Sequence, residues 1–176
     1  GIYVIVLARY LGPEIYGLFV YGQSWYTAFL PLTVFGLAQI ISREIGRNKK
    51  KGANVIQTAL AFRIISASIG AVVCAVVGLI LISNPLMRSI LLVYSIALAG
   101  RAFALWSEHI FIAHESSQYV LQQEAIFRSA EVFTGICLLF SGGGGVLWIV
   151  FVHAAMWWLQ AVRGFFLVRY KFGIAR

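Results

Sequence analysis

Long apolar segments alternate with short polar ones along this chain. Five of the apolar segments are long enough to be membrane-spanning helices, at residues 18–41, 61–82, 86–112, 120–140 and 146–168. A bilayer core requires about 20 mostly apolar residues for each helical span. The pattern therefore predicts an all-α fold, a polytopic bundle of transmembrane helices surrounded by lipid.

The start of the chain predicts an incomplete helix followed by a turn. Residues 1–8 are apolar but too short to span a bilayer, and the first residue is not Met. We therefore expect a fragment cut inside its first helix, with no cleavable signal peptide. A connecting loop is predicted over residues 9–17, which contain Gly12, Pro13 and Gly17. Pro31 is expected to kink the following helix, because neighbouring membrane helices can satisfy the freed carbonyl.

Composition and charge support this interpretation. Hydrophobic residues make up 61% of the chain and charged residues 11%, whereas about a quarter of a soluble domain is charged. The net charge is +8, and basic residues gather in residues 43–51 and after the last span, namely Arg43, Arg47, Lys49, Lys50, Lys51, Arg169, Lys171 and Arg176. Basic connections mark the cytoplasmic side of membrane proteins. We therefore expect a multi-pass protein of the cytoplasmic membrane and no nucleic-acid binding.

The sequence contains no pattern typical of an enzyme, a cofactor site or a metal site. Four glycines at residues 142–145 lack the spacing and the Lys of a phosphate-binding loop, so they predict a flexible outer hairpin. His109, His114 and Glu115 do not follow the order of a zinc protease motif. The two cysteines lie far apart in separate apolar segments, which indicates neither a disulfide framework nor a metal site.

Ionisable residues inside the predicted spans are the strongest functional signal, because a charge within the bilayer is costly and usually faces a partner or a cavity. One stripe with seven-residue spacing follows residues 86–112 and consists of Tyr94, Arg101, Glu108 and Glu115. A second stripe in residues 120–140 has i, i+4, i+7 spacing and consists of Glu124, Arg128 and Glu131. Each stripe lies on one face of its helix.

We predict two ion pairs between these two helices, which a short loop should place antiparallel. Arg101 and Glu131 lie at equal distances from the loop along their helices. Glu108 and Arg128 differ in that distance by about one helical turn. Both pairs are expected to face the interior of the bundle. Two interpretations remain open, since buried pairs either pin helices together or serve a transport path.

Two other spans carry polar residues of interest. Residues 146–168 place a set of residues on one face, namely His153, Trp157, Gln160 and Gly164. For His153 a hydrogen-bonded role in the core is favoured, since polar residues commonly join membrane helices. Arg63 lies near the cytoplasmic mouth of its span, where its side chain is expected to extend towards the interface.

Two segments near the start of the chain resemble a known family. Residues 7–19 read LARYLGPEIYGLF, and residues 36–47 read GLAQIISREIGR. They resemble the polysaccharide biosynthesis membrane proteins, oligosaccharide flippases of the multidrug/oligosaccharidyl-lipid/polysaccharide exporter superfamily. In that family a first helix ends in a similar loop, and a second ends in Gly-Leu followed by an Arg-Glu pair. Residues 169–173, RYKFG, are similar to the basic exit from the sixth helix of the family.

The resemblance implies that residues 1–176 are the N-terminal lobe of a two-lobed exporter whose C-terminal lobe is missing. It implies transport of a lipid-linked, diphosphate-bearing oligosaccharide across the cytoplasmic membrane by alternating access, with no catalysis and no cofactor or metal. The implied partners are this substrate, membrane lipids and the missing lobe. Candidate residues for the substrate cavity are Arg101, Arg128, Glu131, Glu108, His153 and Gln160, and candidate gate residues are Arg9 and Arg63. Glu131 is also the candidate for coupling to a proton or sodium gradient.

Three alternatives remain open at this stage. A multidrug or small-molecule exporter of the same superfamily would share the architecture, although its cavity would usually be less cationic. A membrane-embedded glycan polymerase or glycosyltransferase would more often carry a sizeable polar catalytic loop. A structural membrane subunit would use the charges only to hold helices together and would need no cavity.

Overall fold

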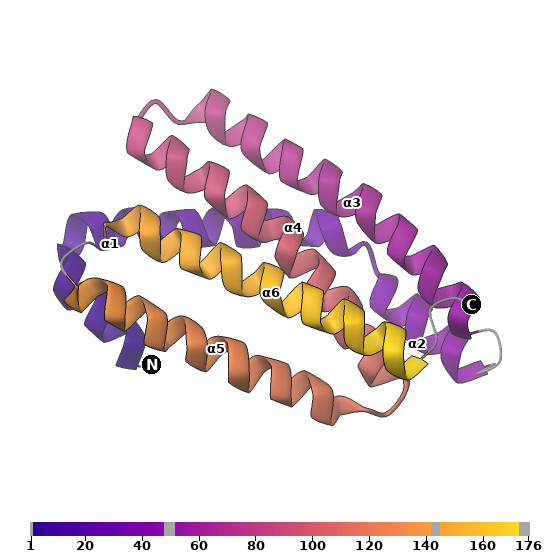
Figure 1. The fold of residues 1–176 in the computed structure, drawn as a ribbon. Helices are drawn as coiled ribbons and strands as arrows, with labels where there is room; N and C mark the ends of the chain where they lie inside the picture. Colours follow the sequence, from indigo (N-terminus) through magenta and orange to yellow (C-terminus); the bar gives the residue numbers. More distant parts are fainter. Residues whose placement is uncertain (1, 48–51, 142–144, 173–176) are drawn as a thin grey trace.

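The computed structural model describes residues 2–47, 52–141 and 145–172, and these residues form helices without any strand. The helices are α1 (Ile2–Val34), α2 (Leu37–Arg47), α3 (Gly52–Leu81), α4 (Pro85–Ala113), α5 (Ser117–Phe140) and α6 (Val146–Phe172), as Figure 1 shows. The predicted all-α bundle is confirmed. Some residues of the predicted basic segments and outer hairpin lie outside the described ranges, namely Lys49, Lys50, Lys51, Arg176 and residues 142–144.

Among the described residues, four helices are long and apolar enough to cross a membrane: α1, α3, α4 and α6. Helix α5 has 24 residues, but it is more polar than these four and carries Glu124, Arg128 and Glu131. A helix with this composition requires polar neighbours within a bilayer. The fold therefore has to bring partners to one face of α5.

Helix α4 is the centre of the bundle and contacts each of the other five helices, while α5 packs mainly against α6 (Figure 1). Small residues allow α4 and α6 to approach closely. A Cβ atom on Gly100 of α4 would lie 3.1 Å from the backbone nitrogen of Trp158 and 3.2 Å from the Cβ of Trp157. Close contact at small residues drives helix association in lipid, where the hydrophobic effect between helices is absent.

The predicted loop over residues 9–17 is wrong in extent, because the helix breaks at Gly12 alone. Gly12 has φ 76° and ψ 165°, a conformation that glycine adopts without a side-chain clash. The chain is helical on both sides of it. Pro13 then begins the second helical segment, a position where its missing N–H removes no hydrogen bond.

The predicted span over residues 18–41 is also too long, because α1 ends at Val34. Phe35 and Gly36 both have positive φ, 38° and 65°, and they separate α1 from α2. Helix α2 buries one face, made of Leu37, Ile41 and Ile45, and exposes Arg43 on another. Its polar composition suits a helix at the end of the bundle, not a continuation of a span. Helix α1 continues for three residues beyond Pro31. Within α1, only Gly12 has non-helical φ and ψ angles.

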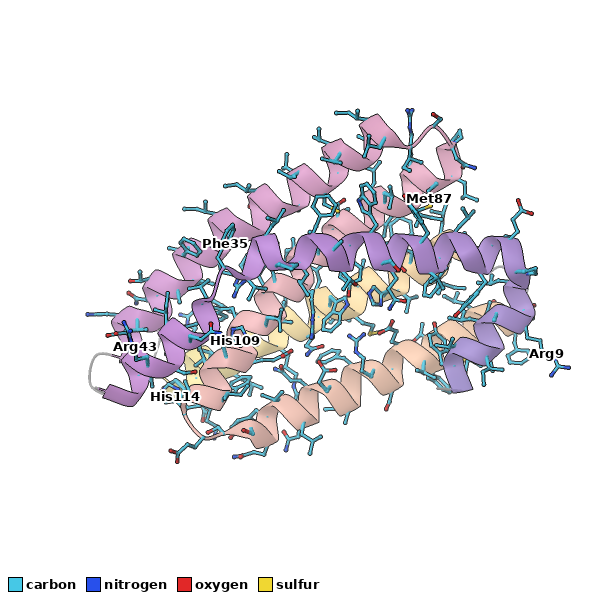
Figure 2. The ribbon with its side chains drawn as sticks, turned by 180° about the vertical axis from the view of Figure 1, so that it is seen from behind. Arg9, Phe35, Arg43, Met87, His109 and His114 are labelled. Carbon is cyan, nitrogen blue, oxygen red and sulfur yellow. The ribbon has the colours of Figure 1, made fainter. Side chains whose placement is uncertain are left out.

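The other helices follow the predicted segments with smaller differences. Helix α3 begins at Gly52, so residues 53–60 continue directly into it and do not form a separate surface turn. Helices α4, α5 and α6 differ from their predicted bounds by a few residues. Figure 2 shows Arg43 and His114 at one end of the bundle and Arg9 and Met87 at the other.

Candidate functional site

Charged and polar side chains from three helices form one connected network. Its members are Arg101 and Glu108 of α4, Glu124, Arg128 and Glu131 of α5, and His153, Trp157 and Gln160 of α6. The spacing within each helix puts the members on one face. All six predicted cavity residues belong to this network.

Glu108 and Glu124 share two donors on one side of the network. Arg101 Nη1 donates to Glu108 Oε1 at 3.4 Å and to Glu124 Oε1 at 3.3 Å. The Gln160 amide Nε2 donates to the same two oxygens, at 3.1 Å each, and Gln160 is completely buried. A hydrogen bond to an ionised carboxylate is stronger than one between neutral groups. The two donors therefore hold two carboxylates of like charge next to each other.

On the other side of the network, Glu131 joins an arginine to a histidine. Arg128 Nη1 donates to Glu131 Oε2, and Arg128 Nε lies 3.9 Å from Glu124 Oε2. The second oxygen of Glu131, Oε1, lies 2.6 Å from His153 Nδ1. The indole nitrogen of Trp157 donates to His153 Nε2 at 3.0 Å. Each nitrogen of the His153 imidazole therefore has a defined partner.

Both arginines of the network lie over the same aromatic ring. The guanidinium carbons of Arg101 and Arg128 are 4.0 Å and 3.9 Å from the ring centroid of Trp157, which is buried. A cation over an indole ring gains about 0.5–2 kcal/mol, more when water is excluded. Trp157 thus gathers two cations that would otherwise repel each other.

The predicted pairs, Arg101 with Glu131 and Glu108 with Arg128, are wrong in their partners. Arg101 contacts Glu108 on its own helix and Glu124 on α5, and Arg128 stays with carboxylates of its own helix. The prediction treated α4 and α5 as direct neighbours, whereas both pack more extensively on α6. Side chains of α6 therefore occupy the space between the two stripes.

The network is most open at Glu124 and Arg128 of α5. The side chains of Glu108 and Glu131 are 10% and 12% exposed, whereas those of Arg128 and Glu124 are 31% and 36% exposed. With His153 neutral, three carboxylates face two guanidinium groups. A ligand that arrives from the α5 side meets two clustered cations that are already paired, and an anion has to displace a carboxylate to bind them.

The two gate candidates occupy very different places. Arg9 is exposed and projects away from the bundle in Figure 2. Arg63 is completely buried, so the prediction that it extends to the interface is wrong. Its Nη1 donates to the carbonyl of Thr33, which also accepts a bond of 2.9 Å from the Ser66 hydroxyl. Arg63 and Ser66 thus satisfy a carbonyl at the end of α1, where the helix has no internal donor.

Aromatic residues around His153 were missed in the choice of candidates. The rings of Tyr26 and Tyr94 stack at 5.3 Å, and each lies edge-on to the imidazole at 5.7 Å. The sequence had placed Trp157 on the same helical face as His153, four residues after it, but not among the cavity candidates. No comparable signal marks Tyr26, because its approach depends on how α1 packs against α4 and α6.

The described residues do not contain a group of three or more His, Cys, Asp or Glu side chains that could hold a metal ion. In comparisons with known proteins, a family model described as polysaccharide biosynthesis protein matches residues 2–175. No match was found among curated proteins or among solved structures. The match to the family model extends far beyond the two segments near the start of the chain.

Proposed function

The chain belongs to the polysaccharide biosynthesis protein family, and on this basis we propose that it is part of a flippase. The flippase moves lipid-linked oligosaccharide or polysaccharide precursors across the cytoplasmic membrane by alternating access. The single observation that carries this proposal is the pair of guanidinium groups gathered on Trp157 inside a membrane protein. No bond is made or broken in this transport, so the chain acts as a transporter and not as an enzyme.

The two arginines suit a diphosphate group that links lipid and sugar. A guanidinium group binds phosphate oxygens through two parallel hydrogen bonds and keeps its charge in a membrane. Arg101 and Arg128 both contact the ring of Trp157 and both pair with Glu124, so a diphosphate that takes the place of the Glu124 carboxylate is expected to reach both. The substrate binds by displacing Glu108, Glu124 or Glu131 from them.

Exchange with carboxylates also provides the release that a transporter requires. A transported ligand has to bind well enough to enter the site and weakly enough to leave it. When the diphosphate departs, the carboxylates return to the arginines and no unpaired cation remains in the low-dielectric site. The extra negative charge of the network thus limits the affinity for the substrate.

The cavity itself forms between two lobes. Residues 1–176 are the N-terminal lobe, and the exposed side of α5 faces the C-terminal lobe. Alternating access then exposes the network to each side of the membrane in turn. Arg63 acts as a gate residue through its hydrogen bond to the end of α1, next to the break at Phe35 and Gly36. Arg9 contributes at the opposite end.

Glu131 couples transport to a proton or sodium gradient in this proposal, since it bridges Arg128 and His153. Glu131→Gln removes the negative charge and is expected to abolish the dependence of flipping on the gradients. Reconstituted protein with imposed proton or sodium gradients provides the measurement. Unchanged gradient dependence in Glu131→Gln would exclude this role for Glu131.

The flippase proposal is tested with the complete protein in liposomes and a fluorescent polyprenyl-diphosphate oligosaccharide. An impermeant quencher measures how fast the probe leaves the inner leaflet. We expect the wild-type protein to flip the probe, and Arg101→Gln with Arg128→Gln to slow flipping by about tenfold or more, since each charged hydrogen bond contributes about 1.5–3 kcal/mol.

The control variant is Arg43→Gln, which removes an exposed arginine outside the network. It is expected to flip the probe at the wild-type rate. Flipping that is lost equally in the control, or is unaffected in the double variant, contradicts the role of the network.

Mass spectrometry of the recovered probe distinguishes transport from catalysis, because a change in its mass indicates a membrane-embedded enzyme. Efflux of small cationic dyes without flipping indicates a multidrug exporter.

A further inference from the structure

The hydrogen bond between Trp157 and His153 fixes the protonation pattern of the imidazole. An indole Nε1–H is a donor only, so His153 Nε2 has to accept the bond of 3.0 Å. The proton of the neutral ring then sits on Nδ1, which donates to Glu131 Oε1 at 2.6 Å. His153 is therefore neutral in the described arrangement, with one tautomer selected by its two partners.

We infer that His153 is a proton-binding site whose occupancy decides whether Trp157 stays beneath the guanidinium groups of Arg101 and Arg128. The significance of this site for transport rests on the proposed flippase function. The inference itself rests on the contacts of the imidazole and the indole, and both can be tested without any substrate.

A second proton on the imidazole is incompatible with the bond to Trp157. Protonated His153 carries an N–H on each nitrogen, and its Nε2–H would point at the Nε1–H of Trp157. Two donors that face each other lose their hydrogen bond and repel. The indole therefore has to turn away when the proton binds, while the Nδ1–H keeps its bond to Glu131.

The arginines lose two contacts as a result. Their guanidinium groups lie over the ring of Trp157 at 4.0 Å and 3.9 Å, and a turned indole no longer supports them. The imidazolium also competes with Arg128 for the negative charge of Glu131. Proton binding thus removes the indole from both cations and weakens the pairing of Arg128 with Glu131, so an anionic ligand displaces the carboxylates more readily. By thermodynamic linkage, an anion bound to the arginines also favours the protonated imidazole.

The groups around His153 decide how favourable its protonation is. From α5, the Glu131 carboxylate stabilises the imidazolium, while Arg128 beside it opposes the added charge. From α4, Arg101 also opposes it at a greater distance, since it lies over Trp157. The other titratable neighbours are the edge-on rings of Tyr26 from α1 and Tyr94 from α4. The direct contact with Glu131 makes the site able to hold a proton.

The test is the intrinsic fluorescence of the complete protein in nanodiscs, followed between about pH 5 and pH 8, where histidines titrate. Three single variants are compared with the wild type. His153→Gln keeps one donor and one acceptor but no titratable group, Trp157→Phe keeps a ring but no N–H, and His114→Gln removes a histidine whose Nδ1 lies 2.9 Å from the Ile110 carbonyl. His114 is the matched control, since it lies outside the network.

We expect a reversible fluorescence change with pH in the wild type and in His114→Gln. This change should be absent from His153→Gln and Trp157→Phe. If His153→Gln does not fold, His153→Asn carries the comparison, because it also lacks a titratable imidazole and keeps Trp157 as the reporter. No change in the wild type, or an equal change in either network variant, overturns the inference.

A second measurement separates this inference from the proposed function. In the flipping assay, Trp157→Phe removes the N–H through which a proton on His153 acts on the arginines, so flipping should depend less on pH in this variant than in the wild type. A pH dependence that is unchanged in Trp157→Phe contradicts the switch. A fluorescence switch without any flipping leaves the proton site intact and refutes the flippase proposal alone.

Discussion

Gln160 and Gln123 provide a sharp test of the network, because both are completely buried amides with different surroundings. Gln160 donates to Glu108 and Glu124. Within the part of the chain that the structure describes, neither the Oε1 nor the Nε2 of Gln123 has a hydrogen-bond partner. Replacement by Met removes the amide in each case and nearly preserves side-chain volume. Gln160→Met should therefore lower stability, whereas Gln123→Met should not.

The magnitudes follow from the contacts. A hydrogen bond to a charged group contributes about 1.5–3 kcal/mol, and a buried polar group without a partner costs about 1–3 kcal/mol. Gln160→Met removes two hydrogen bonds to carboxylates, which lowers stability. It also removes the amide oxygen Oε1, which has no partner among the described residues, and this offsets part of the loss. The free energy of unfolding should fall by about 2–3 kcal/mol. Gln123→Met should leave it unchanged or raise it by about 1 kcal/mol.

Thermal unfolding of the detergent-solubilised protein, followed by size-exclusion chromatography after heating, measures the difference. For a chain of this length about 2–3 kcal/mol corresponds to a shift on the order of 5–10 °C in the midpoint. The midpoint of Gln160→Met should fall by this amount, and that of Gln123→Met should not fall. Equal losses in both variants, or a stabilised Gln160→Met, would refute the assigned role of Gln160.

Three further substitutions test other parts of the structure. A Cβ on Gly164 would lie 2.7 Å from the Cβ of Ser107, so Gly164→Ala should lower stability by about 1–3 kcal/mol. Gly46→Ala, where nothing lies within 4 Å of the new methyl group, should leave stability unchanged or raise it in the same unfolding assay. Arg63→Met removes a buried charge, so it should not lower the unfolding midpoint by more than a few degrees, yet it should slow flipping because the hydrogen bond to Thr33 is lost. A wild-type flipping rate in Arg63→Met argues against a gate at this position.

The existence of the helices could be predicted from the sequence because apolar length decides which segments suit a bilayer. The details at the breaks could not. Gly12 marks a break, but the helix resumes at once because Pro13 is tolerated in a first helical turn. The end of α1 depends on positive φ at Phe35 and on the hydrogen bond from Arg63 to Thr33. Both are consequences of tertiary packing and leave no local pattern.

The members of the network could be predicted, but their pairing could not. Seven-residue spacing identified Arg101 and Glu108, and His153 makes hydrogen bonds to Glu131 and Trp157 as a polar residue between membrane helices is expected to do. The pairing of carboxylates with arginines depends on the position of α6 beside α4 and α5. It also depends on side-chain length, because a long side chain reaches partners more than one turn away along a helix. Periodicity gives the face of a helix and not the identity of its neighbour.

The central claim is that Arg101 and Arg128 select an anionic lipid, and a comparison of two probes tests it most directly. The complete protein in liposomes is given a polyprenyl-diphosphate oligosaccharide or a neutral glycolipid with the same tail and sugars. The ratio of the two flipping rates is then measured for the wild type and for Arg101→Gln with Arg128→Gln. We predict that the wild type favours the diphosphate probe by about tenfold or more and that the double variant loses this preference. An equal preference for the diphosphate probe in both proteins would contradict the claim.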